Sequence, residues 1–311
     1  MRAVGRPFRF AVTARLAATA AEWRDKARRA EALGYDVLLM PDHLGGQFAP
    51  VPALMAAADA TTRMRIGSFV FANDYRNPVL LAKEAATIDL LSDGRLDFGL
   101  GAGWHKRDYE RMGVSYDPPA TRVDRMVEAL RLIKRLFTED EVDFAGEHYV
   151  VRGARLTPRP VQRPRPPIMV GGGGPRLLAI AAREADIVAL VPQVGPDGRH
   201  KIGQITAGAT AAKIARVRAV AGARFDALQF NVIVLDAEVT DAARSVAERI
   251  ATRLKATVNA VVHSPYFLFG SREAIRADLL EFRGRLGIGY YAIPDGAMED
   301  FAPLVADLSG R

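Results

Sequence analysis

Eight short apolar runs, separated by stretches with helical periodicity, constrain the fold of this chain more than any other feature. Most of the runs are continuous and do not alternate with polar residues, which is typical of parallel strands buried on both faces. Eight strand–helix alternations in 311 residues predict an α/β fold of the (β/α)8 TIM-barrel type. The runs occupy residues 8–12, 37–40, 66–71, 96–100, 168–170, 186–191, 228–235 and 290–293.

A doubly wound sheet is the alternative for such an alternation. The glycine-rich dinucleotide fingerprint of that fold is missing after the first run, where Val-Thr-Ala-Arg stands at 12–15. Two segments, 138–167 and 255–271, exceed ordinary connections. We therefore expect one barrel domain over residues 1–311, with insertions at these two places.

The segment 77–103 shows one step of the alternation in detail. It begins with an Asn-Pro pair, suited to the N-cap and first turn of a helix. Ser-Asp-Gly at 92–94 ends this helix. The strand that follows, 96–100, leads into Gly101 and Gly103, and glycines permit close approach to the backbone. Chemistry in barrels gathers at the carboxyl ends of strands, so this end is a candidate site.

Composition narrows the classes of function. Lysine and arginine (43) exceed aspartate and glutamate (36) by seven, but charges of both signs share the helices, and the Arg-Pro tract at 155–167 has no aromatic residue for base stacking. No apolar run approaches the ~20 residues of a membrane span. The chain has no cysteine, and hence no disulfide or thiolate. We expect a cytoplasmic enzyme with a small-molecule substrate and no nucleic-acid or membrane partner.

Two strand ends carry residues suited to chemistry. Asp42 and His43 follow the second run, where an imidazole beside a carboxylate can exchange a proton near neutral pH. The alternative is a loop histidine with an ordinary hydrogen bond. After the fifth run, backbone amides at the start of a helix could bind a phosphate, although a tight turn is the alternative. This second set is Gly171, Gly172, Gly173, Gly174 and Pro175.

The sequence of residues 72–109 closely resembles that of the luciferase-like monooxygenase family, and within it the branch that uses the deazaflavin coenzyme F420. The resemblance rests on Ala-Asn-Asp-Tyr-Arg-Asn-Pro at 72–78, the helix–turn–strand segment at 79–103, and Trp-His-Lys-Arg-Asp-Tyr at 104–109. It is strong over 8–191 and looser over 225–294. It implies an oxidoreductase that passes a hydride between F420 and an unidentified organic substrate.

The resemblance also implies roles for single residues. His43 would face the deazaflavin ring as the catalytic proton donor or acceptor, and Asp42 would orient or hydrogen-bond the ring. A non-prolyl cis peptide is expected between Phe69 and Val70, with Asn73 as a polar contact beside it. The glycines and proline at 171–175 would hold the phosphate. Further cofactor contacts are expected at Gly101, Ala102, Gly103, Trp104 and His105, although Trp104 could be a core residue and His105 an exposed residue at a helix start.

Ala102 bears on the choice of cofactor. Flavin monooxygenases of the family have an arginine for the FMN phosphate where Ala102 aligns, whereas deazaflavin relatives tend to have small residues. The alternatives are an FMN-dependent monooxygenase and a non-catalytic flavin-binding barrel. Relatives are often homodimers, so the resemblance makes a homodimer possible, but the sequence itself does not indicate the oligomeric state. No metal site is expected, because His148, His200 and His263 lack metal-ligand spacing.

Overall fold

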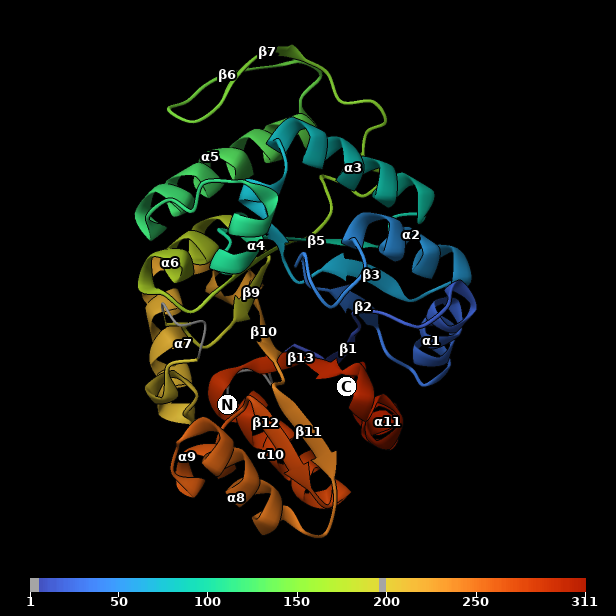
Figure 1. Cartoon of the computed structure of the whole chain (residues 1–311), viewed down its shortest axis with the longest axis vertical. Helices are drawn as coiled ribbons and strands as arrows, with labels where there is room; N and C mark the ends of the chain where they lie inside the picture. Colours follow the sequence, from blue (N-terminus) through green and yellow to red (C-terminus); the bar gives the residue numbers. More distant parts are fainter. Residues whose placement is uncertain (1–5, 196–199) are drawn as a thin grey trace. The chain divides into compact units, whose positions relative to one another are not determined.

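The computed structural model describes residues 6–195 and 200–311 of the chain (Figure 1). The chain divides into two compact units, which are described separately. We call Arg15–Arg28 with Leu38–Val170 the N-terminal unit. Met1–Ala14, Arg29–Val37 and Gly171–Arg311 form the C-terminal unit.

The N-terminal unit is built around strand β5, which pairs in parallel with β3, β4 and β8. Its elements are α1 (Ala20–Ala32), β2 (Val37–Met40), α2 (Pro50–Ala60), β3 (Arg65–Ser68), β4 (Phe71–Ala72), the 3-10 turn η1 (Asn73–Tyr75), α3 (Pro78–Leu91), β5 (Leu96–Gly101), α4 (Lys106–Met112), α5 (Pro119–Thr138), β6 (Val142–Ala145), β7 (Val150–Ala154) and β8 (Ile168–Gly172). Three of them, α1, β2 and β8, extend across the division between the units.

In the C-terminal unit, β13 pairs in parallel with β1 on one side and β10 on the other, and β10 also pairs with β9. The elements are β1 (Arg9–Thr13), α6 (Pro175–Glu184), β9 (Ile187–Leu190), η2 (Ile202–Gln204), α7 (Ala207–Ala221), η3 (Gly222–Ala227), β10 (Gln229–Ile233), β11 (Asp236–Val239), α8 (Ala243–Leu254), α9 (Val258–Val262), β12 (Phe267–Gly270), α10 (Arg272–Leu286), β13 (Ile288–Pro294), η4 (Asp295–Ala297) and α11 (Met298–Leu308).

All eight predicted apolar runs form strands of the nine-stranded main sheet, in which the third run is divided into β3 and β4. Parallel strands that alternate with helices in this number form a (β/α)8 barrel, which confirms the predicted fold class. The division of the third run falls at Phe69–Val70, where the peptide bond is cis, as the family resemblance predicts.

Two glycines permit β3 and β5 to approach each other closely beside this bond. The Ser68 hydroxyl donates to the Gly99 carbonyl oxygen at 2.8 Å, and the Gly99 amide donates to the same hydroxyl at 3.0 Å. A Cβ atom added at Gly99 would collide with the Ser68 carbonyl oxygen. One added at Gly67 would lie 2.7 Å from the Asp97 carbonyl oxygen. The pairing therefore requires the absence of a side chain at both positions.

Helix α3 begins and ends as its sequence predicts. The Asn77 side chain accepts a hydrogen bond from the Val79 amide at 2.9 Å, as an N-cap does. Beyond Leu91, Asp93 and Gly94 adopt positive φ angles of 54° and 75°, which end the helix. These contacts direct the chain into β5 and its carboxyl end.

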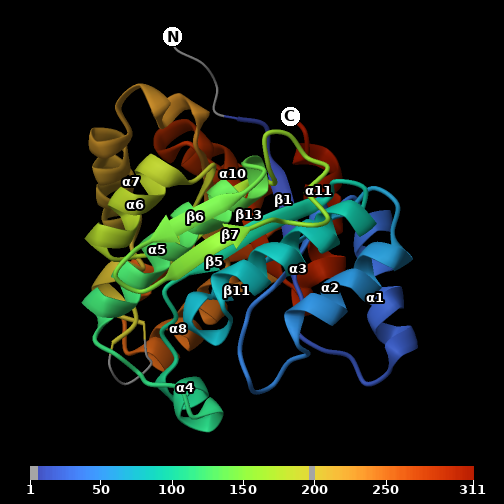
Figure 2. The same cartoon turned by 90° about the horizontal axis from the view of Figure 1, so that it is seen from above.

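The first predicted insertion contains an antiparallel hairpin of β6 and β7 (Figure 2). Glu128, on α5, anchors the turn of this hairpin. Its carboxylate accepts hydrogen bonds from the backbone amides of Glu147 and His148 at 2.9 Å, and from that of Tyr149 at 3.3 Å. The hairpin is thus attached to α5 through its backbone.

The second insertion starts earlier than predicted. Strand β11 begins at Asp236 and pairs in parallel with β12, so the excursion covers 236–270 and not only 255–271. The sequence did not indicate β11 because its four residues, Asp-Ala-Glu-Val, are only partly buried and two of them are acidic. That the whole chain is one domain stays a prediction.

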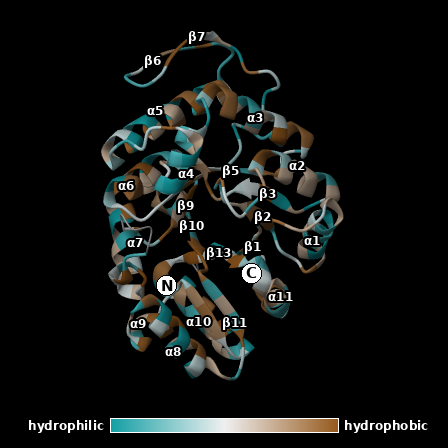
Figure 3. Cartoon of the chain, viewed as in Figure 1, coloured by the Kyte–Doolittle hydropathy of each residue, from teal (hydrophilic) through white to brown (hydrophobic). Residues whose placement is uncertain are grey.

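Helix α5 illustrates how the helices are patterned. Figure 3 shows both hydrophilic and hydrophobic residues along α5. The buried residues of this helix include Met126, Leu130, Ile133 and Phe137. These positions recur at helical spacing, so one side of the helix is apolar. Among the described residues, no helix combines the length and apolarity needed to cross a bilayer.

Substituting Gly99 by alanine tests the close approach of β3 and β5. We expect Gly99→Ala to lower the free energy of unfolding by about 1–3 kcal/mol, the usual cost of forcing extra atoms into a packed region. Denaturant unfolding measures this change. Gly284→Ala is the matched control, because it lies within α10 with nothing within 4 Å of the added Cβ, and alanine there should stabilise by about 0.5–1 kcal/mol. Equal stabilities for the two variants would contradict the steric argument.

Candidate active site

A buried carboxylate that is distant in sequence holds His43. The Nδ1 atom of His43 lies 2.8 Å from Oδ2 of Asp108, in α4. Asp108 is 1% exposed, while the His43 side chain remains 23% exposed. Because an ionised carboxylate can only accept, this hydrogen bond places a proton on Nδ1. It leaves Nε2 of a neutral His43 as the proton-accepting atom.

Asp108 has further neighbours that keep it ionised. The Nδ1 atom of His105 lies 3.0 Å from the same Asp108 oxygen. Burial acts to raise the pKa of Asp108, but the hydrogen bond with His43 and the proximity of both imidazoles outweigh it and hold that pKa below its usual value. Burial, and then the Asp108 charge, raise the pKa of the nearby Tyr75 hydroxyl. Asp108 is therefore an anion among aromatic side chains.

Two predicted contact residues lie against the His43 ring. The rings of Trp104 and His105 each meet it edge-on, with centroids 5.4 Å away. Trp104 is 44% exposed, so it is not a core residue. His105 is the N-cap residue of α4 and is partly buried. The structure thus brings His43, Trp104 and His105 together and adds Asp108, which the sequence analysis missed, while their contact with a cofactor stays a prediction.

The carboxylate next to His43 in sequence is engaged elsewhere. Asp42 accepts a hydrogen bond from Arg76 at 2.6 Å and one from the Ala72 backbone amide at 3.0 Å. It therefore fixes the end of β4. The contact of Asp42 with a cofactor ring stays a prediction.

A second network supports the loop after β5. Asp74 accepts from Arg125 at 2.9 Å and from the Tyr109 hydroxyl at 3.0 Å. A Cβ atom at Gly103, where φ is 71°, would collide with this hydroxyl. Gly103 is thus required by Tyr109, and this packing requirement explains the glycine without a ligand.

Arg122 is a basic side chain that contacts the backbone at Ala102. It is buried and donates to the carbonyl oxygens of Ala102, at 3.3 Å, and of Gly103. Its remaining nitrogens bond the Asp117 carbonyl oxygen at 2.9 Å and the Tyr116 hydroxyl at 3.3 Å. Because its donors are directed at protein oxygens, Arg122 does not replace the FMN-binding arginine that Ala102 lacks.

Asn73 presents an unpaired oxygen. It is 1% exposed, and its Nδ2 atom donates to the Tyr149 hydroxyl at 3.1 Å and to Asp74 at 3.2 Å. Its buried Oδ1 atom has no hydrogen-bond partner in the described part of the chain. Buried polar atoms are rarely left unpaired, so this oxygen is suited to a donor on a ligand, in line with the predicted cofactor contact.

The glycine turn belongs to the C-terminal unit and is partly explained by packing. A Cβ at Gly173 would collide with the Val191 carbonyl oxygen, and one at Gly172 would lie 2.6 Å from Leu177. Helix α6 begins at Pro175 with Gly174 as its N-cap, and no side chain caps it there. Two of the glycines are thus needed for packing. A phosphate contact of the set, including Gly171, stays a prediction.

Lys213, in α7, is a buried cation that the sequence analysis did not identify. It is 5% exposed and donates to the carbonyl oxygens of Val191 at 3.3 Å and Gln204 at 3.2 Å, and to the Tyr266 hydroxyl at 3.2 Å. Burial lowers its pKa to about 8. Its contacts attach the end of β9 to η2, so we interpret Lys213 as a structural residue.

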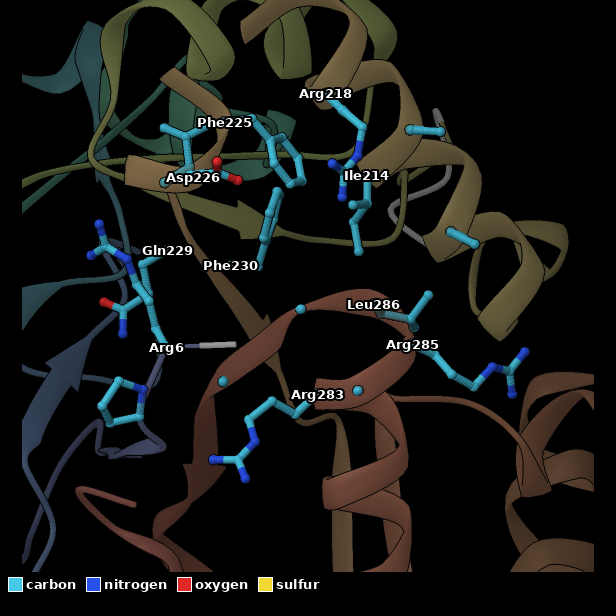
Figure 4. Close-up of a pocket in the computed structure, with 17 residues that line it drawn as sticks. Arg6, Ile214, Arg218, Phe225, Asp226, Gln229, Phe230, Arg283, Arg285 and Leu286 are labelled. Atoms are coloured by element: carbon cyan, nitrogen blue, oxygen red, sulfur yellow. The ribbon is translucent and has the colours of Figure 1, made fainter. Parts of the chain in front are cut away.

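The C-terminal unit also has a cavity of about 1090 Å3, where β10 and β13 begin (Figure 4). Its arginines already have neighbours. The Arg218 guanidinium lies 3.8 Å from the ring centroid of Phe225, and that of Arg283 lies 4.0 Å from that of Phe8. Active sites of barrels lie at the carboxyl ends of the strands. We therefore place the candidate active site at His43 and not in this cavity.

Comparison with known proteins identifies the family of this chain. The sequence model described as luciferase-like monooxygenase matches residues 6–287. A curated relative, the F420-dependent glucose-6-phosphate dehydrogenase of Amycolatopsis mediterranei (strain U-32), is 34% identical over 168 residues. This match covers 51% of the chain and 50% of the relative, so the chain spans about half the length of that protein.

Solved structures share the fold across nearly the whole chain. An F420-dependent secondary alcohol dehydrogenase in complex with an F420-acetone adduct has a TM-score of 0.78 at 17% identity, covering 97% of this chain and 99% of that one. A riboflavin lyase (RcaE) with modified FMN and riboflavin has a TM-score of 0.77 at 15% identity, covering 98% and 93%. At these identities the likeness concerns the fold. With most of its length matched by the family's sequence model, the chain belongs to the luciferase-like monooxygenase family, a family of enzymes.

Proposed function

We propose that this chain is an oxidoreductase that transfers a hydride between coenzyme F420 and an organic substrate. The observation that carries the proposal is the contact of His43 with the buried, anionic Asp108. The sequence identity to the F420-dependent glucose-6-phosphate dehydrogenase supports F420 as the cofactor.

The residues present suit such a cofactor. F420, when bound, supplies the hydride chemistry, while the protein positions the reacting groups. Asn73 offers its unpaired buried oxygen, and Trp104 and His105 form walls beside His43. In the C-terminal unit, the uncapped start of α6 at Gly174 and Pro175 is suited to a phosphate.

His43 moves the proton that accompanies the hydride. Its Nε2 atom accepts the proton when substrate is oxidised, and the protonated imidazole returns it when substrate is reduced. Asp108 stabilises the imidazolium and keeps the ring in one tautomer, since its oxygen accepts from Nδ1. Asp108 is therefore a positioning residue, and His43 is the catalytic one.

An FMN-dependent monooxygenase is the second candidate. The shared fold of the riboflavin lyase with modified FMN favours it. Ala102 argues against it, because it offers no cation to a phosphate, and the donors of Arg122 are used within the protein. A non-catalytic flavin-binding barrel would leave the His43–Asp108 pair without a role. A homodimer and a cytoplasmic location remain part of the proposal.

Titration of the purified protein with F420 and with FMN distinguishes these candidates. We expect F420 to bind with micromolar or tighter affinity and FMN at least about tenfold more weakly, which is a difference of about 1.4 kcal/mol. Quenching of cofactor fluorescence and thermal shift report the binding. A preference for FMN would overturn the F420 proposal and favour oxygen chemistry. Binding of neither cofactor would overturn both.

Substitution of the proton-transfer pair tests the roles of its members. His43→Gln should lower kcat by about 10²–10⁴-fold, the usual contribution of a general acid or base, while F420 affinity changes little. Asp108→Asn should lower kcat and alter the tautomer of His43, because an amide can donate where the carboxylate only accepts. Glucose 6-phosphate and a secondary alcohol are the first substrates to try. Stopped-flow absorbance of F420 follows hydride transfer, and 1H–15N correlation spectra of the imidazole report the tautomer.

Asp93→Asn is the matched control for Asp108→Asn, because Asp93 is exposed in the turn after α3. It should leave both kcat and the His43 tautomer unchanged. Full hydride transfer in His43→Gln would contradict the catalytic role. An unchanged tautomer in Asp108→Asn would contradict the positioning role.

A further inference from the structure

Three side chains beside the candidate active site converge as metal ligands do. His43, His105 and Asp108 each offer one ligand atom, and these three atoms lie within 4.8 Å of one another. The two nitrogens lie 2.8 and 3.0 Å from the shared oxygen. The buried Nδ1 atom of His105 makes no hydrogen bond within the described residues, despite this proximity. The His105 nitrogen is thus close to the Asp108 oxygen without a hydrogen bond to it.

We propose that His43, His105 and Asp108 bind a divalent transition-metal ion of the Zn²⁺ class. Two imidazoles and one carboxylate are a ligand set of catalytic zinc sites, which keep a further position open. Metal–ligand bonds of ~2.1 Å in tetrahedral geometry separate ligand atoms by about 3.4 Å. The observed 2.8 and 3.0 Å between the nitrogens and the shared oxygen would have to widen by about half an ångström to reach this separation.

The backbone presents these ligands before any ion arrives. His105 and Asp108 are three residues apart at the start of α4, and this spacing puts both on one face of a helical turn. His43 comes from the loop after β2. Asp108 is buried and supplies the negative charge, while both imidazole side chains are partly exposed. No metal site was expected from the sequence. Only His105 and Asp108 are close in sequence, and His43 joins them through folding.

Glu128, Glu147 and His148 form the other group with this proximity among the described residues. Both carboxylate oxygens of Glu128 already accept hydrogen bonds from backbone amides of the hairpin turn. Those hydrogen bonds would have to break for an ion to bind. This group is therefore a structural anchor, and it offers a control for the proposal.

Metal binding and proton transfer exclude each other at this site. An ion on Nδ1 of His43 displaces the proton held there and removes the contact with Asp108. Zn²⁺ should therefore inhibit hydride transfer, a consequence that rests on the proposed function. The binding itself does not depend on that function.

Titration of the tag-free apo-protein with Co²⁺ and Zn²⁺, without F420, tests the site. We expect one equivalent of Zn²⁺ to bind by calorimetry, and Co²⁺ to give the visible absorption of a low-symmetry, four- or five-coordinate ion. His105→Gln should weaken Zn²⁺ binding by more than about 100-fold, beyond the ~10–100-fold cost of losing an outer hydrogen-bond partner of a metal site. His148→Gln should leave binding unchanged.

Circular dichroism and thermal melting establish that each variant is folded, and His105→Asn replaces His105→Gln if the latter is not. Loss of binding in His148→Gln, or retention in the folded His105 variant, would overturn the assignment. Absence of Zn²⁺ binding to the unmodified protein would overturn the proposal itself. If such a protein still bound F420, the proposed function would stand while the metal site would not.

Discussion

The arrangement of the candidate active site depends on one buried anion, Asp108. Removing a carboxylate from water is costly unless hydrogen bonds and opposite charge compensate for it. Two histidines and a tyrosine hydroxyl lie around Asp108, and the histidines lower its pKa in spite of burial. The same contacts that stabilise the anion hold the His43 ring in place. The hydrogen bond between His43 and Asp108 therefore both stabilises the buried carboxylate and orients the imidazole for proton transfer. A group that binds Asp108 in place of His43 would also release the His43 ring.

Other charged side chains near the site serve the backbone. Arg122 donates to carbonyl oxygens of the loop after β5, and Asp42 with Arg76 fixes the end of β4. Strand ends in a barrel leave carbonyl and amide groups without ladder partners, and these must be satisfied when buried. The buried charges satisfy them locally. As a result, several residues whose types suggest catalysis or ligand binding are already engaged, and His43 and the Asn73 oxygen stand out by contrast.

The sequence predicted the fold well because its signals were local or periodic. Apolar runs located every strand of the main sheet, and the Asn-Pro start and Ser-Asp-Gly end of α3 were correct within a residue. The site was predictable only in part. Trp104 and His105 were identified through family resemblance, but Asp108 lies 65 residues from its partner His43, and only folding brings them together. Strand β11 was missed for a related reason: its short, mixed sequence is stabilised by pairing with β12, which no local pattern reveals. A His-x-x-Asp spacing at a helix start was the one available sign of Asp108.

The hairpin anchor at Glu128 has a consequence for how this protein can diversify. Glu128 binds the turn through backbone amides, which every residue except proline provides. The side chains at 147 and 148 can therefore change without releasing the turn from α5. The attachment of the turn to α5 therefore does not depend on which side chains it carries. The side chains of the turn can differ between related proteins while the turn stays bound to α5.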